Sequence, residues 1–266
     1  MAYLRMTVVV LAAAAVRAVA APQVPQPADP KPSFEVASVK QNTSAAPQAS
    51  LRVDPGGYLR STAAPVFWLI GGAYGDAKGA LRPEQVVGAP SWLRSERYDI
   101  TAKVPDAYAS GEASPFITMR PFIQSLLEER FNLRTHRESR ELPIYALVRA
   151  RNGSLGPGLS RSTVDCSKDE TKCGFGGGAA GRIKAEALTS DLLMQLLANA
   201  SGRIVIDRTG LEGPFAVDLE WSQDQSVSDK PSIFTAVQEQ LGLRLESARG
   251  SVDVLVIDHV ERPTPD

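Results

Sequence analysis

The chain has 266 residues, of which 43% are hydrophobic and 22% charged, and its formal net charge is −1. This length suits one domain or two small ones, and the composition is that of a globular protein rather than a disordered chain. A chain so close to neutrality has no general attraction for a polyanion, so the composition argues against a nucleic-acid-binding protein.

The first twenty residues have the features of a secretory signal peptide. Arg5 lies in a positively charged start, residues 6–16 are apolar, and residues 18–20 are suited to a signal peptidase. We therefore expect an exported protein, periplasmic or extracellular, with residues 21–32 as a flexible, proline-rich leader. The apolar stretch is too short to span a bilayer and no longer one follows, so no transmembrane segment is expected after signal removal. Loss of Arg5 and Arg17 leaves the mature chain at −3.

Hydrophobic periodicity predicts alternating strands and helices in the first part of the mature chain. The predicted strands are residues 34–39, 58–61, 85–87, 98–104, 133–138 and 144–149. One helix is expected from Pro65 to Tyr74, ended by Gly75, and a second is expected to start near Pro121. Residues 150–181 follow as a long irregular stretch.

The rest of the chain repeats this order of elements. We expect strands at residues 181–185, 203–207 and 215–221, with a helix near 192–200 that ends at Gly202. A last helix begins at Ser232 as its N-cap and ends at Gly242. Two strands joined by a hairpin turn at Arg249 and Gly250 complete the pattern.

A unit of one helix and two strands thus recurs four times. In the clearest match, residues 126–148 align with 236–257, which puts Asn132 opposite Gly242 where a helix gives way to a strand. We interpret the chain as an internal duplication: residues 33–150 form a first half, 151–180 a glycine-rich loop and 181–266 a second half. The predicted class is α+β, with mostly antiparallel sheets and helices packed on one side. The alternative is that amphipathic segments merely share a hydrophobic pattern.

Cys166 and Cys173 are the only cysteines. Because export would place them in an oxidising compartment, a local disulfide is expected. A zinc half-site would need further nearby ligands, and a thioredoxin-type motif needs two residues between its cysteines rather than six.

Four longer segments together resemble a known family. They are residues 34–40, residues 88–93 with 98–103, residues 207–215, and residues 240–246 through 256–263. They look like an uncharacterised family of secreted, acidobacterial-type proteins, a domain of unknown function that covers nearly the whole mature chain. Related domains occur on antirepressor-type membrane metallopeptidases, which implies a sensing or interaction role. The repeated unit is also distantly similar to the short periplasmic domain of secretins and of some transporters for iron complexes.

Familiar catalytic patterns are missing from the sequence. His136 and His259 are the only histidines, and neither a Gly-x-Ser-x-Gly elbow nor a His-Glu-x-x-His helix occurs. The pairs His136/Glu138 and His259/Glu261 could bind a metal if their strands were adjacent, but solvated surface charges explain them more simply. We therefore assign no catalytic residue, no metal ligand and no cofactor.

The candidate binding residues lie in two loops and near the C-terminal strand. They are Trp92, Asp207, Arg208, Thr209, Gly210, Glu212 and His259. Residues 207–210 lack the paired Asp-Thr-Gly turns of an aspartic protease, so Asp207 is expected to accept backbone hydrogen bonds in a turn. Trp68 and Trp221 fall at core spacing, which leaves Trp92 as the exposed tryptophan.

The sequence favours a non-catalytic module that binds a protein, peptide or envelope component. The alternative is an exported hydrolase that uses Asp207, Asp258 or His259.

Overall fold

A computed structural model describes residues 31–44, 48–76, 79–108, 115–150, 153–165, 173–174, 180–223 and 229–264. The predicted signal peptide, most of the leader and Cys166 lie outside these residues. Residues 31–266 belong to one compact unit.

The structure is an α+β fold with mostly antiparallel sheets. In the first half they are β1 (Val36–Asn42), β2 (Ser50–Asp54), β3 (Tyr58–Pro65), α1 (Val66–Ala73), η1 (Pro83–Gln85), β4 (Val86–Val87), α2 (Trp92–Ser95), β5 (Arg97–Lys103), η2 (Asp106–Tyr108), α3 (Pro115–Phe131) and β6 (Arg134–Arg149). They continue with β7 (Leu159–Arg161), β8 (Arg182–Leu188), α4 (Ser190–Ser201), β9 (Val205–Asp207), β10 (Phe215–Glu220), α5 (Ile233–Leu241) and β11 (Leu243–His259).

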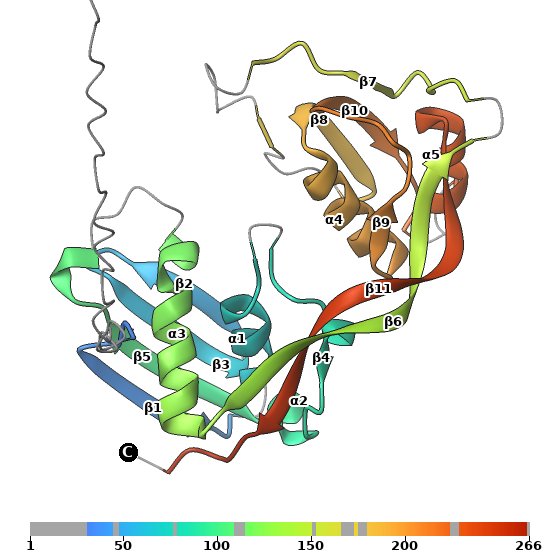
Figure 1. The fold of residues 1–266 in the computed structure, drawn as a ribbon. Helices are drawn as coiled ribbons and strands as arrows, with labels where there is room; N and C mark the ends of the chain where they lie inside the picture. The colour runs from blue at the N-terminus through green and yellow to red at the C-terminus, as the bar shows by residue number, and fades with distance from the viewer. Residues whose placement is uncertain are drawn as a thin grey trace, which may run out of the picture. The chain divides into compact units, whose positions relative to one another are not determined.

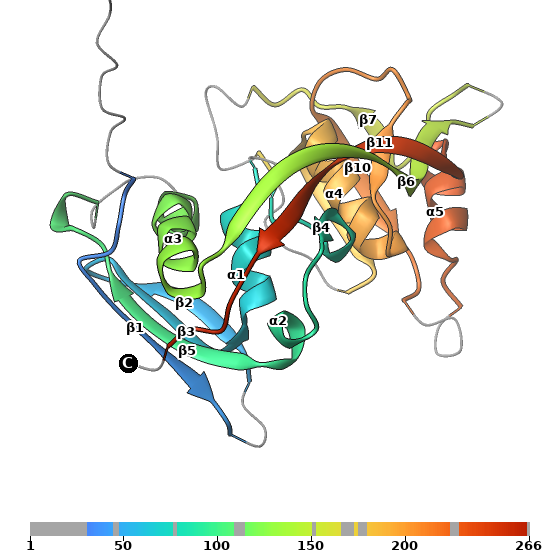
Figure 2. The same ribbon diagram turned by 60° about the horizontal axis from the view of Figure 1, so that its bottom comes forward.

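The first half contains a four-stranded antiparallel sheet in the order β1-β5-β3-β2. Figure 2 shows α1 and α3 over the same face of this sheet. Strand residues such as Leu59 and Ile100 meet helix residues such as Ile70 and Leu127 in one buried cluster, which we call the first core. Burial of these apolar side chains is the main favourable term in folding of this half.

The second half contains a smaller sheet in the order β7-β10-β8, covered by α4 and α5. Its second core joins strand residues such as Ile183 and Leu219 to Leu197 and Val237 of the helices. Strand β7 lies within the stretch predicted to be irregular, and it exists because residues 159–161 pair with β10. Three residues are too few for an alternating hydrophobic pattern to predict a strand.

Strands β6 and β11 are long and pair with each other along nearly their whole length (Figure 1). We call this pair the ribbon. The predicted hairpin turn at Arg249 and Gly250 is wrong: Gly250 lies in mid-strand opposite Leu142, and a Cβ there would lie 2.9 Å from the Cδ1 of Ile144. The glycine therefore permits close packing rather than a turn. The two strands predicted at 133–138 and 144–149 are likewise one strand, with Pro143 opposite Arg249.

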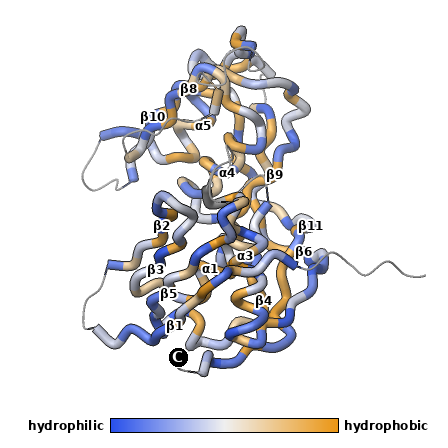
Figure 3. Tube along the Cα trace, turned by 90° about the vertical axis from the view of Figure 1, so that its left-hand side faces the viewer, coloured by the Kyte–Doolittle hydropathy of each residue, from blue (hydrophilic) through white to orange (hydrophobic). Residues whose placement is uncertain are grey.

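Each strand of the ribbon begins in one half and ends in the other. Strand β6 starts after α3, where Leu133 belongs to the first core, and its far end contributes Leu147 to the second core. Strand β11 starts after α5, and its far end contributes Leu255 and Ile257 to the first core. Residues 252–257 are mostly hydrophobic, as the colouring of Figure 3 lets the reader follow. Both cores are therefore completed by a strand that comes from the other half.

The two small sheets have corresponding registers. Strand β3 pairs with β5 from Tyr58↔Lys103 onward, with a register shift between Ser61 and Ala64. Strand β8 pairs with β10 from Arg182↔Glu220 onward, and a shift occurs at the corresponding place.

The parallel strands at the edges of the ribbon also correspond. Val86 of β4 pairs with Leu255 of β11, and Val205 of β9 pairs with Tyr145 of β6. In the alignment that matches Asn132 with Gly242, Tyr145 and Leu255 are equivalent positions.

Three of the predicted helix ends are confirmed, whereas α1 ends at Ala73 with Tyr74 as its C-cap rather than at Gly75. Asn132 has φ 49° and Gly242 has φ 69°, so both adopt the left-handed conformation. Gly202 ends α4 in the same way, and Ser232 caps α5 by accepting the Thr235 N–H at 3.2 Å. Helix α3 starts at Pro115, before the predicted start, and Pro121 lies inside it.

Candidate binding site

Helix α1 and the segment after it form an apolar groove on the first half. The N–H of Leu81 donates to the carbonyl of Gly71 at 2.9 Å, which holds the returning segment against the helix. A Cβ on Gly71 would lie 3.1 Å from the Leu81 oxygen, and one on Gly75 would lie 2.0 Å from that of Gly79. The two glycines therefore permit the close approach on which one wall of the groove depends.

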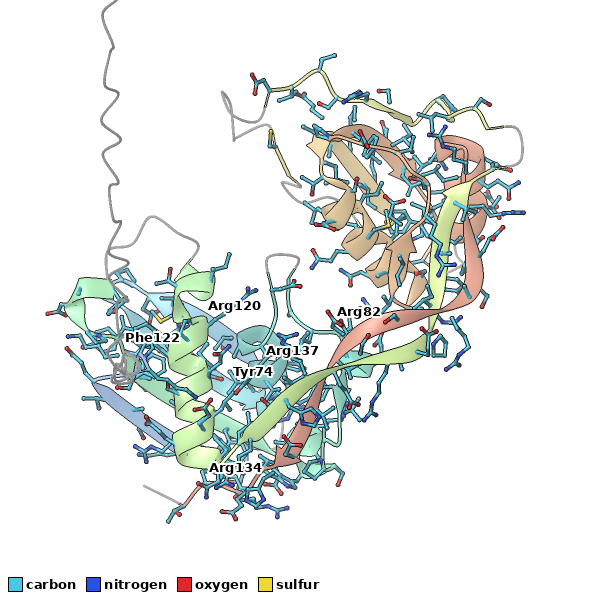
Figure 4. The ribbon with its side chains drawn as sticks, viewed as in Figure 1. Tyr74, Arg82, Arg120, Phe122, Arg134 and Arg137 are labelled. Carbon is cyan, nitrogen blue, oxygen red and sulfur yellow. The ribbon has the colours of Figure 1, made fainter. Side chains whose placement is uncertain are left out.

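Side chains from α3 and β6 hold the C-terminal end of α1 in place. Backbone carbonyls at and just after the end of α1 accept hydrogen bonds from three side chains. Gln124 donates to Ala73 at 2.7 Å, Arg120 donates to Asp76 at 2.8 Å, and Arg137 donates to Tyr74. Figure 4 shows Arg120, Arg137 and Tyr74 in the region between α1, α3 and β6. Cationic groups at a helix C-terminus pair with its free carbonyls and interact favourably with the negative end of the helix dipole. These contacts therefore hold α1, which forms one side of the groove, in place.

The groove is a cavity of about 480 Å³. It is lined by Pro65, Phe67, Trp68, Gly71, Gly72, Ala80, Leu81, Pro83 and Arg94. All but Arg94 are apolar or glycine, and the cavity is open to solvent along one side. An apolar concave surface with one charged group at its wall has the usual character of a ligand site.

Trp68 is 56% exposed, so the prediction that it belongs to the core is wrong. Every other residue of α1 is buried, including Phe67, so Trp68 is the one exposed side chain of the helix. Trp221 is buried as predicted. The helical pattern alone does not identify Trp68, because Phe67 lies outside the same repeat and is buried.

Arg94 stacks on the aromatic side chain beside Trp68. Its Cζ lies 3.4 Å from the centroid of the Phe67 ring, which places the guanidinium over the ring face. Arg94 itself is exposed. Within the described part of the chain, no carboxylate pairs with its guanidinium.

Trp92 has a structural role that differs from the predicted one. It is half-buried against the first core, and the Cζ of Arg262 lies 5.1 Å from its ring centroid. Arg262 also donates to the Glu96 carboxylate, from Nε at 2.9 and 3.1 Å and from Nη2 at 2.7 Å. We call Trp92, Glu96, Tyr98 and Arg262 the clamp, because they fasten the segment after β11 to the first half.

The clamp changes the pKa values of its members. The hydrogen bond from Arg262 lowers the pKa of the Glu96 carboxyl and raises that of the guanidinium. Burial, followed by the hydrogen bond with Glu96, raises the pKa of Tyr98 to about 12. The phenol donates to the carboxylate at 2.9 Å, so it stays protonated.

Residues 207–213 form the turn that the sequence predicted. The Thr209 N–H donates to Asp207 Oδ1 at 2.8 Å, and the Leu211 N–H donates to the Thr209 hydroxyl at 3.1 Å. Gly210 and Gly213 have φ values of 64° and 97°. Arg208, Gly210 and Glu212 are exposed, whereas Thr209 is buried. The turn is therefore held by hydrogen bonds between its own residues, and the Asp207 carboxylate accepts one of them from a backbone N–H.

Asp207 and His259 are far apart. Asp207 pairs with Leu147 of β6, and His259 pairs with Arg134 of the same strand. Their partners Arg134 and Leu147 are thirteen positions apart in β6, which corresponds to roughly 40 Å along an extended strand. Asp207 lines a cavity of about 730 Å³ beside α4, and His259 does not line it. The two residues do not form a common site.

The two histidines contact separate carboxylates. His136 Nδ1 lies 2.8 Å from Asp258, which is the main cause of its raised pKa, and His259 Nε2 lies 3.0 Å from Glu261. Although their strands are adjacent, the described residues include no group of three or more His, Cys, Asp or Glu arranged to hold a metal. Helices long and apolar enough to cross a membrane are likewise absent from the described ranges.

The predicted Cys166–Cys173 bond includes a residue outside the described ranges and stays a prediction. Cys173 itself forms an isolated parallel bridge with Ala187 of β8.

The fold and the site define an α+β domain that carries an open apolar groove. Residues 68–260 match the family model "Protein of unknown function (DUF3738)", which spans more than half of the chain. The protein belongs to this family. No curated protein and no solved structure matches the chain.

Proposed function

We propose that the protein is a non-catalytic binding module whose groove around Trp68 takes an apolar segment of a partner protein or peptide. The observation that carries the proposal is the exposure of Trp68 at the edge of an apolar cavity. A tryptophan beside a preformed apolar pocket is a frequent centre of binding energy, because it buries a large area at little cost in conformational entropy. A partner protein would cover the open side of the groove with its own surface.

Peptides selected on the wild-type protein would test this proposal. Trp68→Ala should weaken their binding at least tenfold, while Phe234→Ala, which removes another partly exposed aromatic in the second half, should leave it within about twofold. Both variants should keep the wild-type melting temperature within about 2 °C, since neither side chain is fully buried. Equal affinity of Trp68→Ala and wild type would contradict the proposal.

The hydrolase alternative has a separate test. Asp207 and His259 would have to act through different sites, because the ribbon separates them. Purified protein would be assayed against peptidase, esterase and glycosidase substrates with and without a chelator. The binding proposal expects no turnover, and turnover that His259→Ala abolishes without a change in melting temperature would overturn it.

We also propose that the protein is exported and acts in the periplasm or outside the cell, with a mature start near Ala21 and a Cys166–Cys173 bond. The signal-like residues 1–20 and the cysteine pair support this proposal. The closed loop is short, so the bond should contribute about 2 to 3 kcal/mol in the chain-entropy model. Intact-mass measurement before and after alkylation of protein from the exported fraction tests it. Two free thiols there would refute the bond.

Internal duplication is the proposed origin of the two halves. The corresponding registers and register shifts of their sheets support it. An experimental structure in which residues 116–149 and 230–260 differ in strand order would contradict it.

A further inference from the structure

Arg94 is the one charged residue among the described side chains that line the groove. In the clamp, the charge of Arg262 is balanced by Glu96 at 2.7 Å. Arg94 stacks on Phe67 and Arg262 stacks on Trp92. Of these two arginines, only Arg262 pairs with a carboxylate of the described residues. The pair is a natural comparison, because one guanidinium is engaged and the other faces the groove.

Stacking on Phe67 fixes the plane of the Arg94 guanidinium. When the ring covers one face of the group, its N–H donors point outward in that plane, where they can meet both oxygens of a carboxylate. A bidentate contact of this kind is among the strongest hydrogen-bonding arrangements in proteins. The stacked arginine is therefore already oriented for an anionic group that lies beside an apolar one.

We infer that the groove recognises a peptide segment in which a large apolar side chain is followed by an acidic one. This inference rests on the proposed function and names its partner chemistry. The apolar side chain fills the cavity beside Trp68 and Leu81, and the carboxylate pairs with Arg94. A peptide segment fits better than an acyl chain, because the open cavity of about 480 Å³ would leave much of a long hydrocarbon in water, whereas a peptide places one apolar side chain in the cavity and keeps its polar backbone outside.

Three labelled peptides of otherwise identical sequence provide the test. The first contains phenylalanine followed by glutamate, the second replaces glutamate by glutamine, and the third replaces phenylalanine by alanine. Wild-type protein should bind the phenylalanine–glutamate peptide about tenfold tighter than either of the others, since a charge-assisted pair and an apolar anchor are each worth about that factor. The preference for glutamate should weaken as salt is raised.

Variants separate the inference from the function on which it rests. Arg94→Gln should abolish the preference for glutamate over glutamine while leaving affinity for the glutamine peptide within about threefold. Arg94→Lys should retain part of the preference, because it keeps the charge but loses the bidentate geometry. Arg262→Gln is the matched control and should keep the full preference. Trp68→Ala should weaken binding of all three peptides.

The outcomes distinguish the two ideas. If wild type binds the glutamate and glutamine peptides equally and Trp68→Ala loses both, the inference fails and the proposed function stands. A preference that survives in Arg94→Gln also overturns the inference. If none of the peptides binds at millimolar concentration, both ideas fail, as they do if a medium-chain fatty acid binds where no peptide does.

Discussion

The small sheets of the two halves have corresponding registers, but the connection between helix and parallel strand differs. Trp68 and Leu192 are each the third residue after the N-cap of their helix, Pro65 in α1 and Thr189 in α4. Leu192 packs against the second core, whereas Trp68 is exposed beside the groove. In the first half residues 74–85 connect α1 to β4, but only residues 202–204 connect α4 to β9. The longer connection supplies Ala80, Leu81 and Pro83, so the binding wall arises where the two halves are not alike.

Separating the halves should have the largest effect. Expressed alone, residues 31–150 lack the end of β11 that completes the first core, and residues 153–264 lack the end of β6 that completes the second. Each fragment should therefore lack near-ultraviolet circular dichroism, and mixing the two should restore it. A stably folded single fragment would show that the halves do not depend on exchanged strands.

Truncation of equivalent core residues should have the next largest effect. Phe131 and Leu241 are fully buried at matching helix ends, as predicted along with Leu127 and Val237. Phe131→Ala and Leu241→Ala should each lower the free energy of unfolding by about 2 to 5 kcal/mol, through lost burial and the cavity left behind. Ile117→Ala on the exposed face of α3 is the control and should cost less than about 1 kcal/mol. Chemical denaturation of the three variants provides the measurement.

Exchanging the two helix-ending residues should expose a difference between the halves. Asn132→Gly should be nearly neutral because glycine adopts the left-handed conformation readily, although a hydrogen bond of 2.6 Å to Glu261 is lost. Gly242→Asn should cost about 2 kcal/mol, since a Cβ there would lie 2.4 Å from the backbone oxygen of Ser154. Equal costs in urea denaturation would mean that the two caps have equivalent surroundings.

The clamp should produce the smallest effect, and one that depends on pH. Because the folded-state pKa of Glu96 lies below its unfolded value, the clamp stabilises the protein at neutral pH. This stabilisation is lost as pH falls through the folded-state pKa. Glu96→Gln should therefore be less stable than wild type by up to about 1 kcal/mol near pH 7, and the difference should shrink and vanish as the pH falls below the folded-state pKa of Glu96. A difference independent of pH would assign the loss to packing.

The sequence was sufficient for most elements of the fold and insufficient for their long-range pairing. Alternation located β5 and β10, and the positive-φ residues Asn132 and Gly242 located two helix ends, because these signals are local. The ribbon was missed since Pro143 and Gly250 resemble turn residues, and only pairing between residues more than a hundred positions apart makes them strand residues. Local propensity carries no information about a partner so distant.

The binding site was predicted less well than the fold. The turn at residues 207–213 formed as expected, but Trp92 is fastened by Arg262 and His259 lies far along the ribbon from Asp207. The groove depends on the close approach of Leu81 to Gly71, which no periodicity reveals. Periodicity could not have identified Trp68 either, because the neighbouring Phe67 lies outside the same repeat of α1 and is buried.

The exchange of strands has a consequence for synthesis on the ribosome. A growing chain that has produced residues 31–150 already holds α1, α3 and the first sheet, yet Leu255 and Ile257, which close that core, are still untranslated. The amino-terminal half must therefore wait, with apolar surface uncovered, until more than a hundred further residues have emerged. Neither half can mature ahead of the other, so the polypeptide should reach its native state in one late, concerted step.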